Sequence, residues 1–201
     1  MRINQLRLDW KAATAIVVTT LLMVVEGYHR LLPHDCYDRT LLYLGVPLLV
    51  ILLVFRESPA NYGFSLGDWK AGLVITAAAC AGVLLLTLLL ARIPSFQTYY
   101  APLNGLGLPL TVMTALDLLG WEFMLRGFLL FALYRVCGPL AILIQAMPFT
   151  IAHIGKPELE ALSCIFGGSL FGYIAWRTRS FVYPFLIHWL LETLVILLAA
   201  G

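Results

Sequence analysis

The sequence predicts an all-α membrane protein: a polytopic helical bundle with about seven transmembrane helices, forming a single membrane domain over residues 1–201. Two observations predict this fold class. Hydrophobic residues make up 61% of the 201 residues and charged residues only 12%, whereas a soluble domain carries roughly 25% charged residues. The hydrophobic residues also gather in runs that approach the roughly 20 residues a helix needs to cross the hydrocarbon core of a bilayer.

Seven apolar segments follow one another, separated by polar or turn-forming residues. Pro33 ends the first segment, and a polar loop of residues 56–63 follows the second. Gly138 and Pro139 begin the fifth segment, and Pro157 follows its end. The second and fifth are short for a membrane span. The predicted spans are residues 12–32, 41–55, 71–91, 108–134, 138–154, 160–176 and 181–200.

The charge pattern indicates a multi-pass protein of the cell membrane, with the lipid bilayer as its surroundings. The net charge of +2 is small, and no basic stripe points to a nucleic-acid partner. Lys and Arg are more numerous in the segments that lie on the same side as the N-terminus, which predicts a cytoplasmic N-terminus. The four cysteines have no CxxC spacing, so neither a disulfide framework nor a zinc finger is expected.

Ionisable residues inside the predicted spans are the most informative feature of the chain. A charge at the bilayer centre costs about 2.5 kcal/mol or more. Such residues therefore pair inside a bundle or line a wet cavity, where they serve chemistry or proton movement. The residues of this kind are Glu26, Asp117, Glu122, Arg126, His153, His188 and Glu192.

Three short patterns carry most of these residues. Glu122 and Arg126 are spaced i, i+4, so they share one helix face and can form an ion pair. His153 stands near the end of the fifth span, and His188 and Glu192 again share an i, i+4 face. Each pattern alone also fits a structural role, as an ion pair, an interfacial histidine or a local hydrogen bond. Together they predict one internal cavity, because lipid-facing placement on three helices would be very costly.

Such a cavity suits the hydrolysis of an amide bond at a site reached from the bilayer. A carboxylate and a histidine can activate water as a general base, and a second histidine can donate to the developing oxyanion. No cofactor and no metal ion are expected, because the sequence has no HExxH pattern. The alternative is a catalytic divalent metal held by two histidines and two carboxylates.

In order and spacing, the patterns resemble the CAAX prenyl endopeptidase and bacteriocin-processing family (CPBP or Abi proteins), which are glutamic-type intramembrane proteases. That family carries EExxxR, FxxxH, and HxxxN or HxxxD on successive helices. This chain reads WExxxR from Trp121 to Arg126, FxxxH from Phe149 to His153, and HxxxE from His188. The glycine-rich segment 167–180 also resembles the helix that leads to the last motif. The resemblance covers a family-like catalytic core at about residues 107–195.

The resemblance implies an intramembrane endopeptidase that cleaves a membrane-tethered peptide or protein C-terminal tail. His153 matches the histidine that activates water together with the family's first glutamate. His188 matches the histidine that supports the oxyanion. Glu122 matches the family's second glutamate, and Arg126 matches the arginine that holds it.

Two positions depart from the family pattern. Trp121 stands where the family has its first glutamate, and an indole ring cannot take a proton from water. Glu192 replaces Asn or Asp, and an ionised carboxylate cannot donate to an oxyanion. Either Glu122 acts as the base after a small rotation of its helix, or Glu192 supplies the carboxylate from across the cavity. Asp117, one turn before Trp121, is a further candidate carboxylate.

The remaining alternatives are not proteases. A catalytically inactive family member could act as a membrane scaffold or immunity protein, and Trp121 favours this alternative. A proton-coupled transporter would use the same buried groups, but the inverted repeats typical of transporters are not seen in the sequence.

Overall fold

The computed structural model describes residues 9–103 and 107–199, and all regular secondary structure in these two ranges is helical. The predicted fold class, an all-α membrane bundle, is confirmed. The first eight residues, part of the N-terminal segment behind the predicted orientation, lie outside the described residues.

In the described residues, five helices are long and apolar enough to cross a membrane. The second of them is one continuous helix that alternates between α-helical and π-helical turns. The five are α1 (Trp10–Tyr28), the Asp35–Phe55 helix, α4 (Trp69–Leu90), α10 (Glu158–Thr178) and α11 (Val182–Ala199). The Asp35–Phe55 helix consists of α2 (Asp35–Arg39), η1 (Thr40–Gly45), α3 (Val46–Leu49) and η2 (Val50–Phe55).

The two other predicted spans are helical as well, but they are not among these five, so the count of seven spans stays a prediction. One is a continuous run of α6 (Gly107–Glu122), the π-helical segment η5 (Phe123–Leu129) and α7 (Leu130–Cys137). The other is the short apolar stretch Leu140–Ile151, made of α8 (Leu140–Ile144) and α9 (Ala146–Ile151). The shorter elements are η3 (Pro59–Tyr62), α5 (Pro94–Tyr100) and η4 (Ala101–Leu103).

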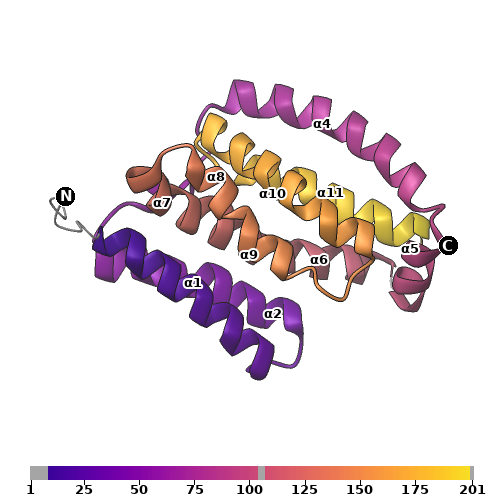
Figure 1. Cartoon of the computed structure of the whole chain (residues 1–201), viewed down its shortest axis with the longest axis horizontal. Helices are drawn as coiled ribbons and strands as arrows, with labels where there is room; N and C mark the ends of the chain where they lie inside the picture. Colours follow the sequence, from indigo (N-terminus) through magenta and orange to yellow (C-terminus); the bar gives the residue numbers. More distant parts are fainter. Residues whose placement is uncertain (1–8, 104–106, 200–201) are drawn as a thin grey trace, which may run out of the picture.

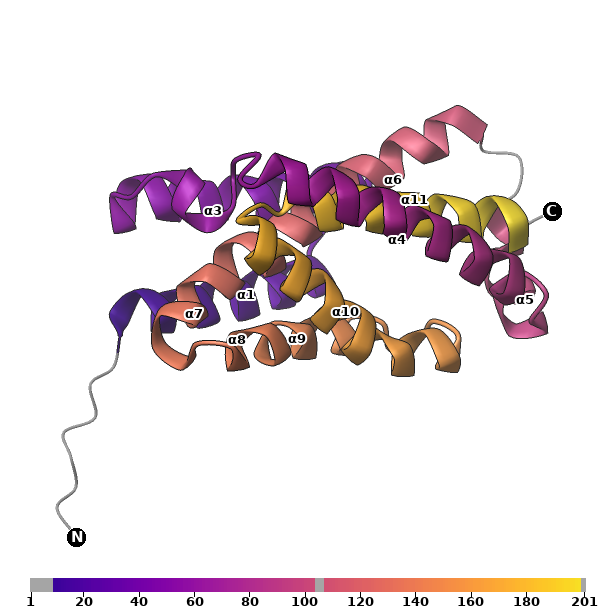
Figure 2. The same ribbon diagram turned by 90° about the horizontal axis from the view of Figure 1, so that it is seen from above.

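The helices run roughly side by side, and successive long helices point in alternate directions (Figure 1). Helix α4 forms one edge and α1 with α2 forms the opposite edge, with α10 and α11 between them. Figure 2 shows the same bundle from above, with α8 and α9 on the side away from α4. The outer surface of α4 exposes leucines such as Leu73, Leu85 and Leu89, which suits contact with lipid.

The start of α4 ties this outer helix to the bundle. Asp68 accepts a hydrogen bond from the backbone N–H of Ala71 and pairs with Arg177 at 3.0 Å. Such a cap satisfies one of the backbone donors that every helix start leaves unpaired. One turn further on, Gly72 allows α4 to approach the buried ring of Tyr183 on α11. The Asp68–Arg177 pair joins the start of α4 to α10, and the close approach at Gly72 fixes α4 against α11.

The largest buried cluster surrounds η5, in which every residue is buried. Phe128 stacks on Phe55 at 5.9 Å between ring centroids, and Phe123 contacts Phe181 at 5.2 Å. These contacts join η5 to the Asp35–Phe55 helix and to the start of α11. The segment that carries Arg126 therefore lies at the centre of the bundle.

We predict that Gly72→Ala destabilises the protein by about 1–3 kcal/mol, because overpacking forces its neighbours apart. The added Cβ would overlap the ring of Tyr183, whose hydroxyl is held by the carbonyl oxygen of Leu66 at 2.8 Å. Thermal unfolding in detergent micelles measures the effect.

Gly82→Ala, on the same helix, is the matched control. Apart from the adjacent residues and the nearby backbone of its own helix, no atom lies within 4 Å of a Cβ at Gly82, so the unfolding temperature should stay the same or rise slightly. Equal destabilisation by both substitutions would contradict the role given to Gly72.

Candidate active site

The site begins at the junction of α6 and η5. Glu122 is the last residue of α6 and Arg126 lies within η5, and both side chains are fully buried. The Arg126 Nη1 atom lies 3.2 Å from the Glu122 Oε1 atom, so the contact expected from the i, i+4 spacing is present. Widened π-helical turns inside α-helices occur frequently at functional sites.

Arg126 is held from the other side by an aromatic ring. Its guanidinium carbon lies 4.1 Å from the centre of the Phe149 ring, which is a favourable cation–π geometry. Phe149 reaches this place because α10 carries Gly168 opposite it, where a Cβ would lie only 2.9 Å from the Phe149 ring. At Gly172, a Cβ would overlap the side-chain amide of Gln145. The close helix packing expected from glycines thus positions the second motif beside the first.

The third motif meets the first through His188. Its Nδ1 atom lies 2.8 Å from Glu122 Oε1, although the two residues are 66 positions apart. The same carboxylate oxygen therefore contacts both Arg126 and His188. The His188 ring also packs against Phe149 and Phe171, at 5.5 and 5.2 Å between centroids.

His153 lies two residues after the end of α9, and its ring centroid lies 4.4 Å from that of Phe149. Its Nδ1 atom is 2.8 Å from the carbonyl oxygen of Phe149. A carbonyl oxygen can only accept, so Nδ1 carries the proton and the Nε2 atom of the neutral ring is an acceptor. The Glu122 carboxylate imposes the same tautomer on His188. Both histidines therefore leave Nε2 for a ligand.

One cavity of about 230 Å³ brings the second and third motifs together. It lies among α4, α5, α10, α11 and the end of α9, and much of its lining is apolar. Glu122 does not line this cavity, but it contacts His188, which does. Its ionisable and hydroxyl-bearing lining residues are Tyr100, His153, Glu160, Ser163, Cys164, His188 and Glu192.

A cluster that the sequence interpretation missed lies at this cavity. Lys156 Nζ lies 3.1 Å from Glu192 Oε1 and 2.9 Å from Glu160 Oε1. The hydroxyl of Tyr100 contacts Glu160 at 2.9 Å and Lys156 at 3.4 Å. Burial opposes the charged form of Lys156, but the attraction of Glu192, Tyr100 and Glu160 outweighs it and raises the pKa of Lys156 well above its usual value. The i, i+4 spacing of Lys156 and Glu160 is the signal that could have indicated this pair.

Two residues of the first motif region point elsewhere. Trp121 packs against Tyr43 of η1 at 4.7 Å between ring centroids. Asp117 pairs with Arg39 at 3.1 Å, and Arg39 also binds Glu26 at 2.7 Å. Neither Trp121 nor Asp117 is among the residues that line the cavity.

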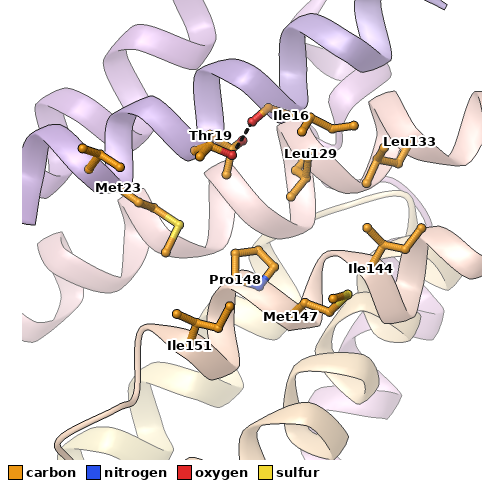
Figure 3. Close-up of a pocket in the computed structure, with 11 residues that line it drawn as sticks. Ile16, Thr19, Met23, Leu129, Leu133, Ile144, Met147, Pro148 and Ile151 are labelled. Carbon is orange, nitrogen blue, oxygen red and sulfur yellow. Dashed lines mark hydrogen bonds between the residues drawn. The ribbon is translucent and has the colours of Figure 1, made fainter. Parts of the chain in front are cut away.

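A larger, apolar cavity of about 540 Å³ lies between α1 and the α8–α9 pair (Figure 3). Its lining includes Met23 from α1 and Pro148 from α9, and it contains none of the predicted site residues. In residues 9–103 and 107–199, no three His, Cys, Asp or Glu side chains come together as a metal-ligand group.

The fold and the site define a helical membrane protein with a buried carboxylate–histidine pair beside a cavity. Residues 102–194, slightly less than half of the chain, match the family described as type II CAAX prenyl endopeptidase Rce1-like. The match supports the resemblance inferred from the motifs: this segment, which holds all three, is similar to the CAAX protease (CPBP) family, a family of proteases. No curated protein and no solved structure matches the chain. The family and the five apolar helices identify an integral membrane protein.

We predict that Arg126→Gln destabilises the fold by about 3–5 kcal/mol, because removing one partner of a buried ion pair leaves the other charge uncompensated. Thermal unfolding in micelles measures the change. Arg177→Gln is the control, because Arg177 also forms an ion pair, with Asp68, but both side chains are nearly half exposed. That substitution should cost no more than about 1 kcal/mol. Similar costs for the two variants would contradict the role assigned to Arg126.

Proposed function

We propose that this protein is an intramembrane endopeptidase that hydrolyses a peptide bond in a membrane-tethered C-terminal tail. One observation carries the proposal: Glu122 holds Nδ1 of His188 at 2.8 Å, and His188 lines a cavity that His153 also lines. A buried carboxylate that orients a histidine is a recurrent means of making the histidine a general base.

In the proposed reaction, His188 Nε2 takes a proton from a water molecule, and the resulting hydroxide attacks the carbonyl carbon of the substrate. Glu122 stabilises the imidazolium that forms. His153 accepts a hydrogen bond from the same water through Nε2 and orients it. His188 then returns the proton to the leaving amine as the C–N bond breaks, which leaves a carboxylic acid and an amine. The acid then gives its remaining proton to the amine, so the products are a carboxylate and an ammonium group.

This assignment differs from the one that the family pattern implies. There, His153 activates water and His188 supports the oxyanion. In this chain, Trp121 occupies the position of the family's first glutamate. Glu122, which matches the family's second glutamate, contacts His188. The proposed base is therefore the Glu122–His188 pair, and the step needs neither a metal ion nor another cofactor.

The cavity lining supports an apolar, membrane-embedded substrate. Leu86 and Leu90 from α4 and Phe96 from α5 contribute to it, and such side chains suit a hydrophobic tail. Substrates of this chemistry include a prenylated C-terminus, a bacteriocin leader and a sorting signal. We place the protein in the cell membrane, with its N-terminus in the cytoplasm and no nucleic-acid partner.

A second candidate function is a catalytically inactive scaffold or immunity protein that binds a membrane peptide in the same cavity. Trp121 favours it, because this residue replaces the family's first glutamate and packs against Tyr43, away from the cavity lining.

Cleavage of vesicle-embedded peptides tests the proposal. The peptides end in a farnesylated CAAX tail or in an unprenylated hydrophobic tail. We expect His188→Ala, Glu122→Gln and His153→Ala to lower kcat by about 10²–10⁴-fold, the range of general acid–base catalysis. His29→Ala is the control, because His29 is exposed at the end of α1. If the wild-type protein binds these peptides but cleaves none, the scaffold function is favoured.

Trp121→Glu distinguishes a rearranged site from a lost one. We predict that restoring the family's glutamate leaves kcat unchanged or lower and reduces thermal stability, because position 121 meets the Tyr43 ring and would place a carboxylate against it. The same cleavage assay and unfolding in micelles measure both effects. A gain in kcat would show that the carboxylate reaches the water and would contradict the assignment of the base to Glu122 and His188.

A further inference from the structure

The polar cluster around Lys156 joins four parts of the chain at the cavity. Lys156 belongs to the short connection between α9 and α10, which also contains His153. Its ammonium group meets Glu192 of α11 at 3.1 Å, Glu160 of α10 at 2.9 Å and Tyr100 of α5 at 3.4 Å. Three donors thus meet three oxygen atoms, and an ammonium group has no further hydrogen to donate.

The connection that holds His153 is itself short and internally bonded. The N–H of His153 donates to the carbonyl of Thr150, and the N–H of Lys156 donates to the carbonyl of His153, each at 3.1 Å. The His153 carbonyl is thus bonded to the residue whose side chain is fixed to α10 and α11. Movement of Lys156 would therefore move the backbone of His153.

Lys156 also forms an ion pair with Glu192. That carboxylate lines the cavity one helical turn beyond His188, at a position where the family carries Asn or Asp. Left unpaired there, it would repel the negative oxygen that develops on the substrate carbonyl. Lys156 lies close enough to offset part of this charge, although it also pairs with Glu160.

We propose that Lys156 is a positioning residue: it offsets the charge of Glu192 in the cavity and holds the His153 connection against α10 and α11. This inference rests on the proposed function for its effect on catalysis, whereas the clamp itself is independent of cleavage. Lys156 is not among the residues that line the cavity, and it acts through Glu192 and His153.

Hydrogen–deuterium exchange of the full chain in micelles tests the clamp without any cleavage assay. Lys156→Met should raise amide exchange in residues 152–157 by about tenfold or more, as expected when a local structure loses its tether. Lys70→Met is the matched control, because Lys70 is exposed at the start of α4, and it should leave this segment unchanged. Unchanged exchange in Lys156→Met would overturn the proposal, whether or not the protein is a protease.

A double-substitution cycle in the cleavage assay tests the charge. Lys156→Met should lower kcat by about tenfold or more with little change in KM, since unpaired buried charges are strongly unfavourable. In the Glu192→Gln background the same Lys156→Met substitution should lower kcat less than about threefold, because coupled residues are not additive.

The outcomes separate the two proposals. A purely structural lysine would give the same loss of activity with and without Glu192→Gln, and this result would overturn the charge-offsetting role. A wild-type protein that cleaves no tail would refute the proposed function, while the exchange experiment would still decide whether Lys156 clamps the connection.

Discussion

A single carboxylate oxygen organises the centre of this protein. Glu122 Oε1 contacts Arg126 at 3.2 Å and His188 at 2.8 Å, in a region where both partners of the ion pair are fully buried. Removing charges from water is costly, and partners with suitable geometry must offset that cost. The carboxylate therefore fixes η5 relative to α11. Through the Arg126–Phe149 contact it also fixes the end of α9, so that all three motifs depend on one interaction.

Close packing makes this arrangement feasible. In lipid there is little hydrophobic driving force between helices, so small residues and polar contacts hold them together. Gly168 lets the Phe149 ring approach α10, and the buried Gln145 amide donates to the carbonyl of Gly168 at 2.8 Å. The short α9 helix is thereby fixed between α10 and the Arg126 guanidinium. His153, two residues after α9, is placed at the cavity as a consequence.

The parts of the structure that could be predicted from the sequence are local. The apolar runs predicted the helices, and the i, i+4 spacing predicted the Glu122–Arg126 contact. Because ionisable side chains are unfavourable in lipid, the sequence also predicted that His153 and His188 share a cavity. The contact between Glu122 and His188 could not be predicted in the same way, because it depends on the rotation of α6 and η5. A π-helical segment changes that rotation. In helices with apolar residues on every face, the sequence pattern does not show which face points inward. Lys156 was missed for a related reason, since its partners come from three other elements.

The presence of ion-pair partners does not distinguish a catalytically active site from an inactive one, since any buried charge needs a partner if the protein is to fold. The two histidines offer a better criterion. A structural histidine in a membrane bundle is expected to have both ring nitrogens satisfied, because buried polar groups are nearly always hydrogen-bonded. His153 and His188 each use Nδ1 for an internal acceptor, and in the described part of the chain no hydrogen bond to either Nε2 is formed. Both rings border the same cavity, so this arrangement favours two acceptors kept for a ligand over a core sealed for stability.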